Sequence, residues 1–162
     1  MKLGEGVEWG LHCVTLLAML PPDSVLSAAQ LAEFHGIPQP YLSKALQALS
    51  RAGITTATGG RTGGYRLARQ AHEVTMLHVV EAIDGGDATF RCTEIRRRGP
   101  SRTAKPTYTP VCAIATVMYR ADEAWRDVLT RTTLADIVDD VARTSTDERT
   151  RRAVTWLTRA IA

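Results

Sequence analysis

Three cysteines, Cys13, Cys92 and Cys112, are the side chains of this sequence with the most distinctive chemistry. An odd number of cysteines at wide spacing fits metal ligation or thiol oxidation better than a framework of disulfides. The alternative is that they are small buried hydrophobic residues. We interpret Cys13, which lies in an apolar stretch, as core filling.

Glu8 and His12 are a second pair of residues of the types that bind metals. They lie in the segment 7–20, where apolar residues recur with a helical period until Pro21 and Pro22 end it. Residues four apart project from one face of a helix, about 5 to 6 Å from each other, which suits adjacent ligands. The alternatives are a hydrogen-bonded core histidine and an acidic residue that favours the positive end of its helix.

Two short helices joined by a tight turn follow the segment that carries Glu8 and His12. Ser27 is placed to cap a helix over residues 28–35, and Gly36 ends it. After a connection that contains proline, a third helix is predicted over residues 39–52. Such a pair forms a helix-turn-helix, whose second helix lies in the major groove of DNA.

A predicted hairpin comes directly after the third helix. Residues 54–58 are rich in β-branched side chains, residues 59–64 are rich in glycine, and residues 65–68 alternate again. A hairpin in this position is a wing. Residues 74–83 are then predicted to form a helix that closes the domain.

The segment after this helix is strongly basic. Residues 91–120 carry seven Lys or Arg against one acidic residue, although the net charge of the whole chain is only +3. The run Arg96-Arg97-Arg98 and three prolines predict a loop with little regular structure over residues 93–111. The arginine run is either a phosphate-binding patch or a solvated loop beside an anionic group.

Amphipathic helices are predicted for the remainder of the chain. From Cys112 to about Arg131 apolar residues recur every three or four positions, which indicates one long helix. Two shorter helices are predicted over residues 133–142 and 148–160. The fold class is therefore mainly α with a small β-hairpin, a winged helix-turn-helix domain plus a long dimerisation helix.

These features resemble the IscR/NsrR-like family of bacterial winged helix-turn-helix regulators, several of which hold iron–sulfur clusters. The resemblance covers nearly the whole chain. It rests on the start of the first helix, residues 41–49, the wing around Gly63-Gly64-Tyr65, and a cysteine-containing loop that leads into a long helix. Many cluster-binding members have three cysteines in this loop, whereas here only Cys92 and Cys112 flank it.

The chain is most similar to redox-sensing members of that family, and this resemblance implies a 2Fe-2S cluster shared by two subunits. The implied ligands are Cys92 and Cys112 of one subunit and Glu8 and His12 of the other. Thiolates are the usual ligands of such clusters, and imidazole can replace thiolate and raise the potential. Carboxylate is an uncommon ligand, so Glu8 is the weakest member of this set.

Trp9 adjoins both proposed ligands of the first helix. Our hypothesis is that its ring moves with the charge of the cluster and transmits the cluster's state to the DNA-binding helices. Core packing is the alternative role.

The residues expected to contact DNA lie on the third helix and the wing. The N-terminal part of a recognition helix faces base edges. Lys44 and Arg51 favour phosphate contacts, and Arg61 at the tip of the wing is expected to reach a minor groove or a phosphate. Any of these side chains could instead be a solvated surface residue. The full candidate set is Gln39, Tyr41, Ser43, Lys44, Gln47, Arg51 and Arg61.

We predict three functional regions from this organisation. Residues 1–90 form the DNA-binding domain, residues 91–111 the cluster-binding loop, and residues 112–162 the dimerisation helix with the C-terminal helices. The protein is expected to be a homodimeric, redox-responsive transcriptional regulator, and we expect a repressor that binds operator DNA.

Two rival interpretations keep the regulator but replace the cluster, either with a disulfide between Cys92 and Cys112 or with zinc held by the same four residues. An enzyme is disfavoured because the sequence has no phosphate-binding glycine loop, nucleophile elbow or HExxH helix. No apolar run approaches the roughly 20 residues that span a bilayer, and the start of the chain lacks a signal-peptide pattern. These features predict a cytoplasmic protein with no membrane partner and no small-molecule substrate.

Overall fold

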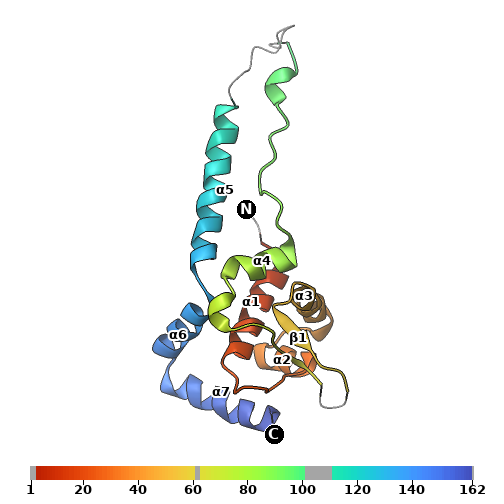
Figure 1. The fold of residues 1–162 in the computed structure, drawn as a ribbon, viewed down its shortest axis with the longest axis vertical. Coiled ribbons are helices and arrows are strands. Elements are labelled where there is room, and N and C mark those ends of the chain that lie inside the picture. Colours follow the sequence, from red (N-terminus) through yellow and green to blue (C-terminus); the bar gives the residue numbers. More distant parts are fainter. Residues whose placement is uncertain (1–2, 61–62, 101–110, 162) are drawn as a thin grey trace. The chain divides into compact units, whose positions relative to one another are not determined.

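The computed structural model describes residues 3–60, 63–100 and 111–161. The chain forms two compact units, one of residues 2–86 with 129–162 and the other of residues 87–128. Figure 1 shows the order of the elements along the chain. The predicted fold class, mainly helical with one small hairpin, is confirmed.

The larger unit begins with three helices around a common core. They are α1 (Glu5–Ala18), α2 (Ala28–His35) and α3 (Gln39–Arg51). Ser27 caps α2 through a reciprocal pair of hydrogen bonds with Gln30, and Gly36 ends the helix in the left-handed conformation at φ 67°. The two helices and the turn predicted from the sequence are therefore present, with the boundaries of α2 as expected.

The wing is a two-stranded antiparallel hairpin of β1 (Thr55–Ala57) and β2 (Tyr65–Leu67). Tyr65 also exchanges backbone hydrogen bonds of 2.8 and 3.1 Å with Leu26, in the connection before α2. The wing is thus fastened to the helix-turn-helix by backbone bonds as well as by its own ladder.

Further helices complete the larger unit. The short 3-10 helix η1 (Ala71–Glu73) and α4 (Met76–Asp84) follow the wing, and α6 (Leu134–Thr144) and α7 (Asp147–Ala160) come from the end of the chain. Leu134 donates its backbone N–H to Val74, and Met76 donates to Thr132, so the start of α6 pairs with the start of α4.

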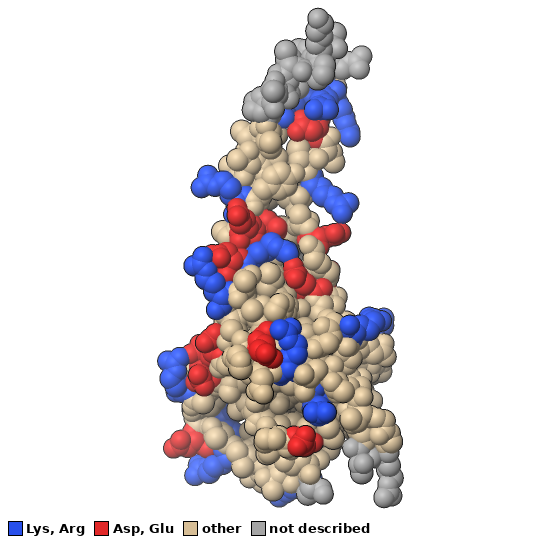
Figure 2. Space-filling model, viewed as in Figure 1, with Lys and Arg blue, Asp and Glu red and all other residues tan. Residues whose placement is uncertain are grey.

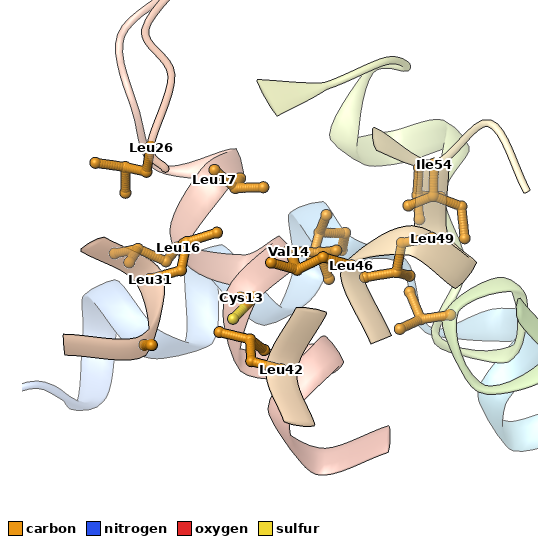
Figure 3. Packing of buried hydrophobic residues seen from close by; sticks show 14 residues of the cluster. Cys13, Val14, Leu16, Leu17, Leu26, Leu31, Leu42, Leu46, Leu49 and Ile54 are labelled. Atoms are coloured by element: carbon orange, nitrogen blue, oxygen red, sulfur yellow. The ribbon is translucent and has the colours of Figure 1, made fainter. Parts of the chain in front are cut away.

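The core of this unit is apolar and centred on α1. Figure 3 shows Cys13 and Val14 of α1 packed among leucines of the neighbouring helices, Leu31 of α2 and Leu42 and Leu46 of α3. All five side chains are fully buried. Because one side of α1 is tightly packed in this core, the positions of the side chains on its exposed side are fixed.

The smaller unit contains most of one long helix and a short turn. The helix is α5 (Ala113–Arg131), and the turn is the 3-10 helix η2 (Ile95–Arg97) within the predicted loop. Thr89 donates two hydrogen bonds to Asp122, and Phe90 packs edge-to-face on Tyr119, so the segment after α4 is held against α5. None of the helices described is both long and apolar enough to cross a membrane.

Candidate functional site

Cys92 and Cys112 both lie in the smaller unit, are half-buried and are free thiols. Cys112 immediately precedes α5, where the first backbone N–H groups of the helix point outward. Hydrogen bonds from the N–H groups of Ala115 and Ile114, together with the positive charge of Arg96, lower the pKa of the Cys112 thiol. This environment favours the thiolate, which is the form that binds metals and attacks electrophiles.

Cys92 lies in the same electrostatic neighbourhood. Its Sγ donates a hydrogen bond to Glu94 at 3.7 Å, and the Glu94 carboxylate is paired with Arg96 at 2.8 Å. Arg96 in turn interacts electrostatically with both cysteines. The structure therefore places the two predicted thiol ligands around one arginine.

Glu8 and His12 are both exposed on α1, one turn apart, on the side of the helix away from the core. Neither side chain is engaged in an ion pair within the described part of the chain. Their carboxylate and imidazole are thus accessible on a rigid helix, as adjacent ligands must be.

His35 is a neighbour of His12 that the sequence did not reveal. The two rings lie 5.7 Å apart, and the Nε2 atom of His35 is buried without a hydrogen-bond partner. Burial, and then the charges of His12 and Arg149, lower the pKa of His35 to about 4. It lies on α2, 23 positions along the chain, so only the crossing of α1 and α2 brings it near His12.

These four candidate ligands form two pairs, each with two donors. Among the described residues no group of three or more His, Cys, Asp or Glu side chains could hold a metal ion by itself. The types of donor, two thiols with one of them activated, an imidazole and a carboxylate, fit the ligands that a 2Fe-2S cluster accepts. A site with four protein ligands would need the Cys92–Cys112 pair together with the Glu8–His12 pair.

Cys13 takes no part in either pair. It is completely buried on α1, and burial raises the pKa of its thiol to about 12. The expectation that Cys13 fills the core is confirmed, because its side chain is fully buried within the hydrophobic cluster.

The exposed side of α3 carries the residues predicted to contact DNA. Gln39, Tyr41, Lys44, Gln47 and Arg51 are exposed. Ser43 is half-buried, and its hydroxyl donates to the backbone carbonyl of Gln39 at 3.0 Å, so that hydroxyl keeps only its acceptor sites for a ligand. Arg61, predicted at the tip of the wing, lies outside the described residues.

An open groove of about 410 Å³ separates part of α3 from the start of α1. Trp9 and Ile83 form apolar walls, and Tyr41, Lys44 and Arg51 of α3 line the opposite side. The rings of Trp9 and Tyr41 lie 6.3 Å apart with a tilt of 60°. The helix that bears Glu8 and His12 therefore contacts the predicted recognition helix through an aromatic pair.

Positive and negative side chains are mixed on one face of the molecule. On the face shown in Figure 2, Lys and Arg alternate with Asp and Glu and do not merge into one basic field. Attraction of an anionic partner on that face would therefore depend on individually placed cations.

Solved structures of regulators have the same fold. CymR, the global cysteine regulator of B. subtilis, shares 22% identity with a TM-score of 0.68, covering 86% of this chain and 97% of its own. IscR from T. potens shares 20% identity with a TM-score of 0.67, covering 92% and 96% respectively. The oxidized form of CymR from Staphylococcus aureus shares 22% identity with a TM-score of 0.65, covering 91% and 99%.

A family comparison extends this likeness to the sequence. The model of the Rrf2 family, described as an iron-dependent transcriptional regulator, matches residues 3–140. The predicted class of protein, a regulator and not an enzyme, is confirmed by this match. The chain belongs to the Rrf2 family of DNA-binding transcriptional regulators.

Proposed function

We propose that this protein is a homodimeric repressor that senses redox state through a 2Fe-2S cluster held by Cys92 and Cys112 of one subunit and Glu8 and His12 of the other. The observation that carries the proposal is that each compact unit holds one pair of donors, and two donors cannot complete a four-ligand site. A second copy of the chain supplies the missing pair. A bound cluster would contribute a one-electron redox change.

The two pairs have different tasks in this proposal. Cys112, at the start of α5, offers a thiolate that its backbone hydrogen bonds already stabilise, and Cys92 supplies the second sulfur. Glu8 and His12 approach from a helix whose other side is buried in the core of the DNA-binding unit. A change at the site would thus act on a rigid element that packs against α3.

The route from site to DNA that we propose runs through Trp9. Its ring lies beside Tyr41 of α3, so a rotation of Trp9 would alter a contact made by the recognition helix. Identical Trp9 rotamers in oxidised and reduced crystals would contradict this relay, while leaving the cluster and the DNA site untouched.

DNA recognition in this proposal is shared among the exposed residues of α3. Gln39, Tyr41, Ser43 and Gln47 face base edges, and Lys44 and Arg51 bind phosphates, as does Arg61 of the wing unless it enters a minor groove. Exposure supports this assignment for five of the six that lie within the described residues, and Ser43 is half-buried.

Anaerobic purification with analysis of iron, acid-labile sulfide and visible absorption tests the cluster directly. The Cys92→Ser, Cys112→Ser and His12→Ala variants should each lose iron and colour, whereas Cys13→Ala should retain both. Iron content that is the same in all four variants would contradict the ligand set.

Operator binding in each redox state tests the sensing role. An operator can be selected from a random DNA library, and its affinity measured for protein reduced and oxidised under anaerobic conditions. Equal affinities in the two states would remove the redox function but not the DNA-binding function.

A second candidate is a regulator whose sensor is the thiol pair itself. The lowered pKa of Cys112 and the shared neighbourhood of Cys92 favour it. A peroxide can oxidise one thiolate to a sulfenic acid, a two-electron step, and the other thiolate then attacks that sulfur and displaces water, which leaves a disulfide and a chain with two fewer hydrogens. A colourless protein whose mass falls by two hydrogens per chain on oxidation would support this function. A colourless protein that contains zinc would instead support a zinc site with the same ligands.

A further inference from the structure

The three consecutive arginines of the basic run have different environments. Arg96 donates to both carboxylate oxygens of Glu94, at 2.8 and 3.0 Å, and its side chain is only 26% exposed. Arg97 approaches Glu94 at 3.9 Å and is 59% exposed. Arg98 is exposed and makes no ion pair in the described part of the chain. Of these three arginines, Arg96 is the one whose side chain is held in place by a two-pronged ion pair.

The backbone holds Arg96 in this position. Glu94 adopts the left-handed conformation at φ 49°, which is unfavourable for a residue with a side chain, and the 3-10 turn Ile95–Arg97 follows immediately. The turn brings Arg96 back onto Glu94, two residues earlier. A conformation of this kind persists because the surrounding interactions hold it, and the two-pronged ion pair is the interaction that the structure shows.

The Glu94–Arg96 pair lies beside both candidate sulfur ligands. Cys92 donates to the same Glu94 carboxylate at 3.7 Å. The Arg96 guanidinium interacts favourably with negative charge on Cys112 and Cys92, whereas the Glu94 carboxylate opposes negative charge on Cys112. One guanidinium is therefore shared by two sulfurs that lie 20 positions apart in the sequence.

We propose that Arg96, positioned by Glu94, is the fixed counter-cation for negative charge on the Cys92 and Cys112 sulfurs. A fixed positive charge stabilises whichever state of the sulfur site is more negative. For a cluster this is the reduced state, so Arg96 raises the midpoint potential. That last consequence rests on the proposed function, whereas the charge pairing itself does not.

The charge pairing can be measured in the metal-free, reduced full-length protein by alkylation. Each thiolate sulfur displaces iodide from iodoacetate, which is anionic, or from iodoacetamide, which is neutral. At each cysteine the rate with iodoacetate is divided by the rate with iodoacetamide. This ratio reports the local charge, because both reagents react with the same thiolate fraction, which therefore cancels. Arg96→Gln should lower this ratio at Cys92 and Cys112 by about two- to fivefold, the effect of one nearby charge in a watery site.

The matched control is Arg98→Gln, which removes the same charge two positions away and should leave both ratios unchanged. Arg96→Lys should restore most of the ratio, which a merely structural role of Arg96 would not predict. An Arg96→Gln ratio equal to that of the unaltered protein, or a fall of the same size in Arg98→Gln, overturns the proposal.

The loaded protein supplies a second readout. If the cluster is present, Arg96→Gln should lower its midpoint potential, and a fivefold change in the redox equilibrium corresponds to about 40 mV for one electron. A cluster whose potential is the same in Arg96→Gln overturns the tuning role even where the alkylation ratios change. A protein that takes up no cluster overturns the proposed function, and the alkylation ratios still decide whether Arg96 is the counter-cation.

Discussion

At the level of single residues, two exposed cations of α3 are suited to binding DNA. Lys44 and Arg51 are exposed cations on α3, and neither has an ion-pair partner among the residues the structure describes. Unpaired cations on a recognition helix are suited to phosphates, because contact releases counterions from the DNA.

Lys44→Ala should weaken binding to all DNA sequences by a similar factor and reduce the slope of log affinity against log salt by about one. Fluorescence anisotropy over a series of salt concentrations measures both effects. The control is Arg143→Ala, which removes a cation already paired with Asp140 on α6. A Lys44→Ala slope equal to that of the unaltered protein would show that Lys44 does not touch phosphate.

His35 should make the stability of the metal-free protein fall in mildly acidic solution. Burial lowers its pKa to about 4 in the folded chain, from 6.5 in a free side chain. Above pH 6.5 the imidazole is neutral in both states, so stability is complete. Between pH 6.5 and 4 the His35 imidazole binds a proton in the unfolded chain but not in the folded chain. The free energy of unfolding therefore decreases as pH falls.

Urea unfolding at pH 7.5 and pH 5.0 measures this loss, which should reach about 1 to 2 kcal/mol at the lower pH. Other groups titrate in the same range, so the His35→Gln variant is measured alongside. Its loss of unfolding free energy between the two pH values should be smaller by the contribution of His35. Equal losses in the two proteins would mean that His35 is protonated in the fold.

At the level of elements, close backbone approaches hold the wing to the helix-turn-helix. A Cβ on Gly64 would lie 2.6 Å from the carbonyl carbon and oxygen of Leu26 and 2.9 Å from the nitrogen of Ser27. These are backbone atoms, which cannot move aside as the end of a side chain can. Gly64 is therefore required by the contact between wing and α2.

Gly64→Ala should destabilise the protein by about 1 to 3 kcal/mol and weaken DNA binding, because the bridge between Leu26 and Tyr65 must open. Thermal unfolding and operator affinity measure the two effects. Gly59→Ala is the control within the same hairpin, since nothing lies within 4 Å of a Cβ there. Equal unfolding temperatures of the two variants would contradict the packing argument.

The last helix, α7, lies beyond the residues that match the family, which end at 140. It nonetheless packs on α2, where Trp156 contacts Phe34 edge-to-face at 5.1 Å and donates a hydrogen bond to Glu33 at 3.1 Å. The side chain of Gln30 also donates to the carbonyl of Ala160 at 2.7 Å. α7 thus supports the first helix of the helix-turn-helix.

Trp156→Ala should cost about 2 to 3 kcal/mol of stability, since it removes a large aromatic contact and a hydrogen bond. Val154→Ala, on the same helix at a side chain that is 56% exposed, should change stability by less than about 0.5 kcal/mol. Urea unfolding of both variants measures these changes in the free energy of unfolding. Similar unfolding midpoints would show that α7 does not support α2.

At the scale of the whole molecule, α5 presents an apolar face that the single chain leaves exposed. Ile114, Val117 and Val128 are 70%, 62% and 63% exposed, and they recur at helical spacing. Exposed apolar faces of this kind are typical of subunit interfaces. This face is the physical basis for proposing a homodimer.

Val117→Glu should convert the proposed homodimer into a folded monomer by placing a charge within that face. Light scattering after size exclusion measures the mass, and circular dichroism confirms that the helices remain. Thr116→Glu, which adds the same charge about 100° around the axis of α5 from Val117, should remain dimeric. A Val117→Glu protein that is still a dimer would exclude α5 as the interface.

Local patterns in the sequence were sufficient for the elements and for the family. Ser27 and Gly36 specify a cap and a helix end through interactions within a few residues, so α2 was predictable. The β-branched residues before the glycine-rich run made the wing predictable in the same local way. Cys13 was recognisable as core because helical periodicity places it among apolar residues. Glu8 and His12 were singled out by the family resemblance, and the same periodicity places them one turn apart on the first helix.

Tertiary structure alone decided which distant residues meet. The packing of α2 on α1 brings His35 to His12, and the return of the chain after residue 87 onto α5 brings Arg96 to Cys112. The sequence could not separate Arg96 from Arg98, because their difference lies in the left-handed Glu94 and the ion pair that follows from it. Side-chain chemistry is thus set by residue type, but burial and charge environment are set by contacts between segments that local patterns do not encode.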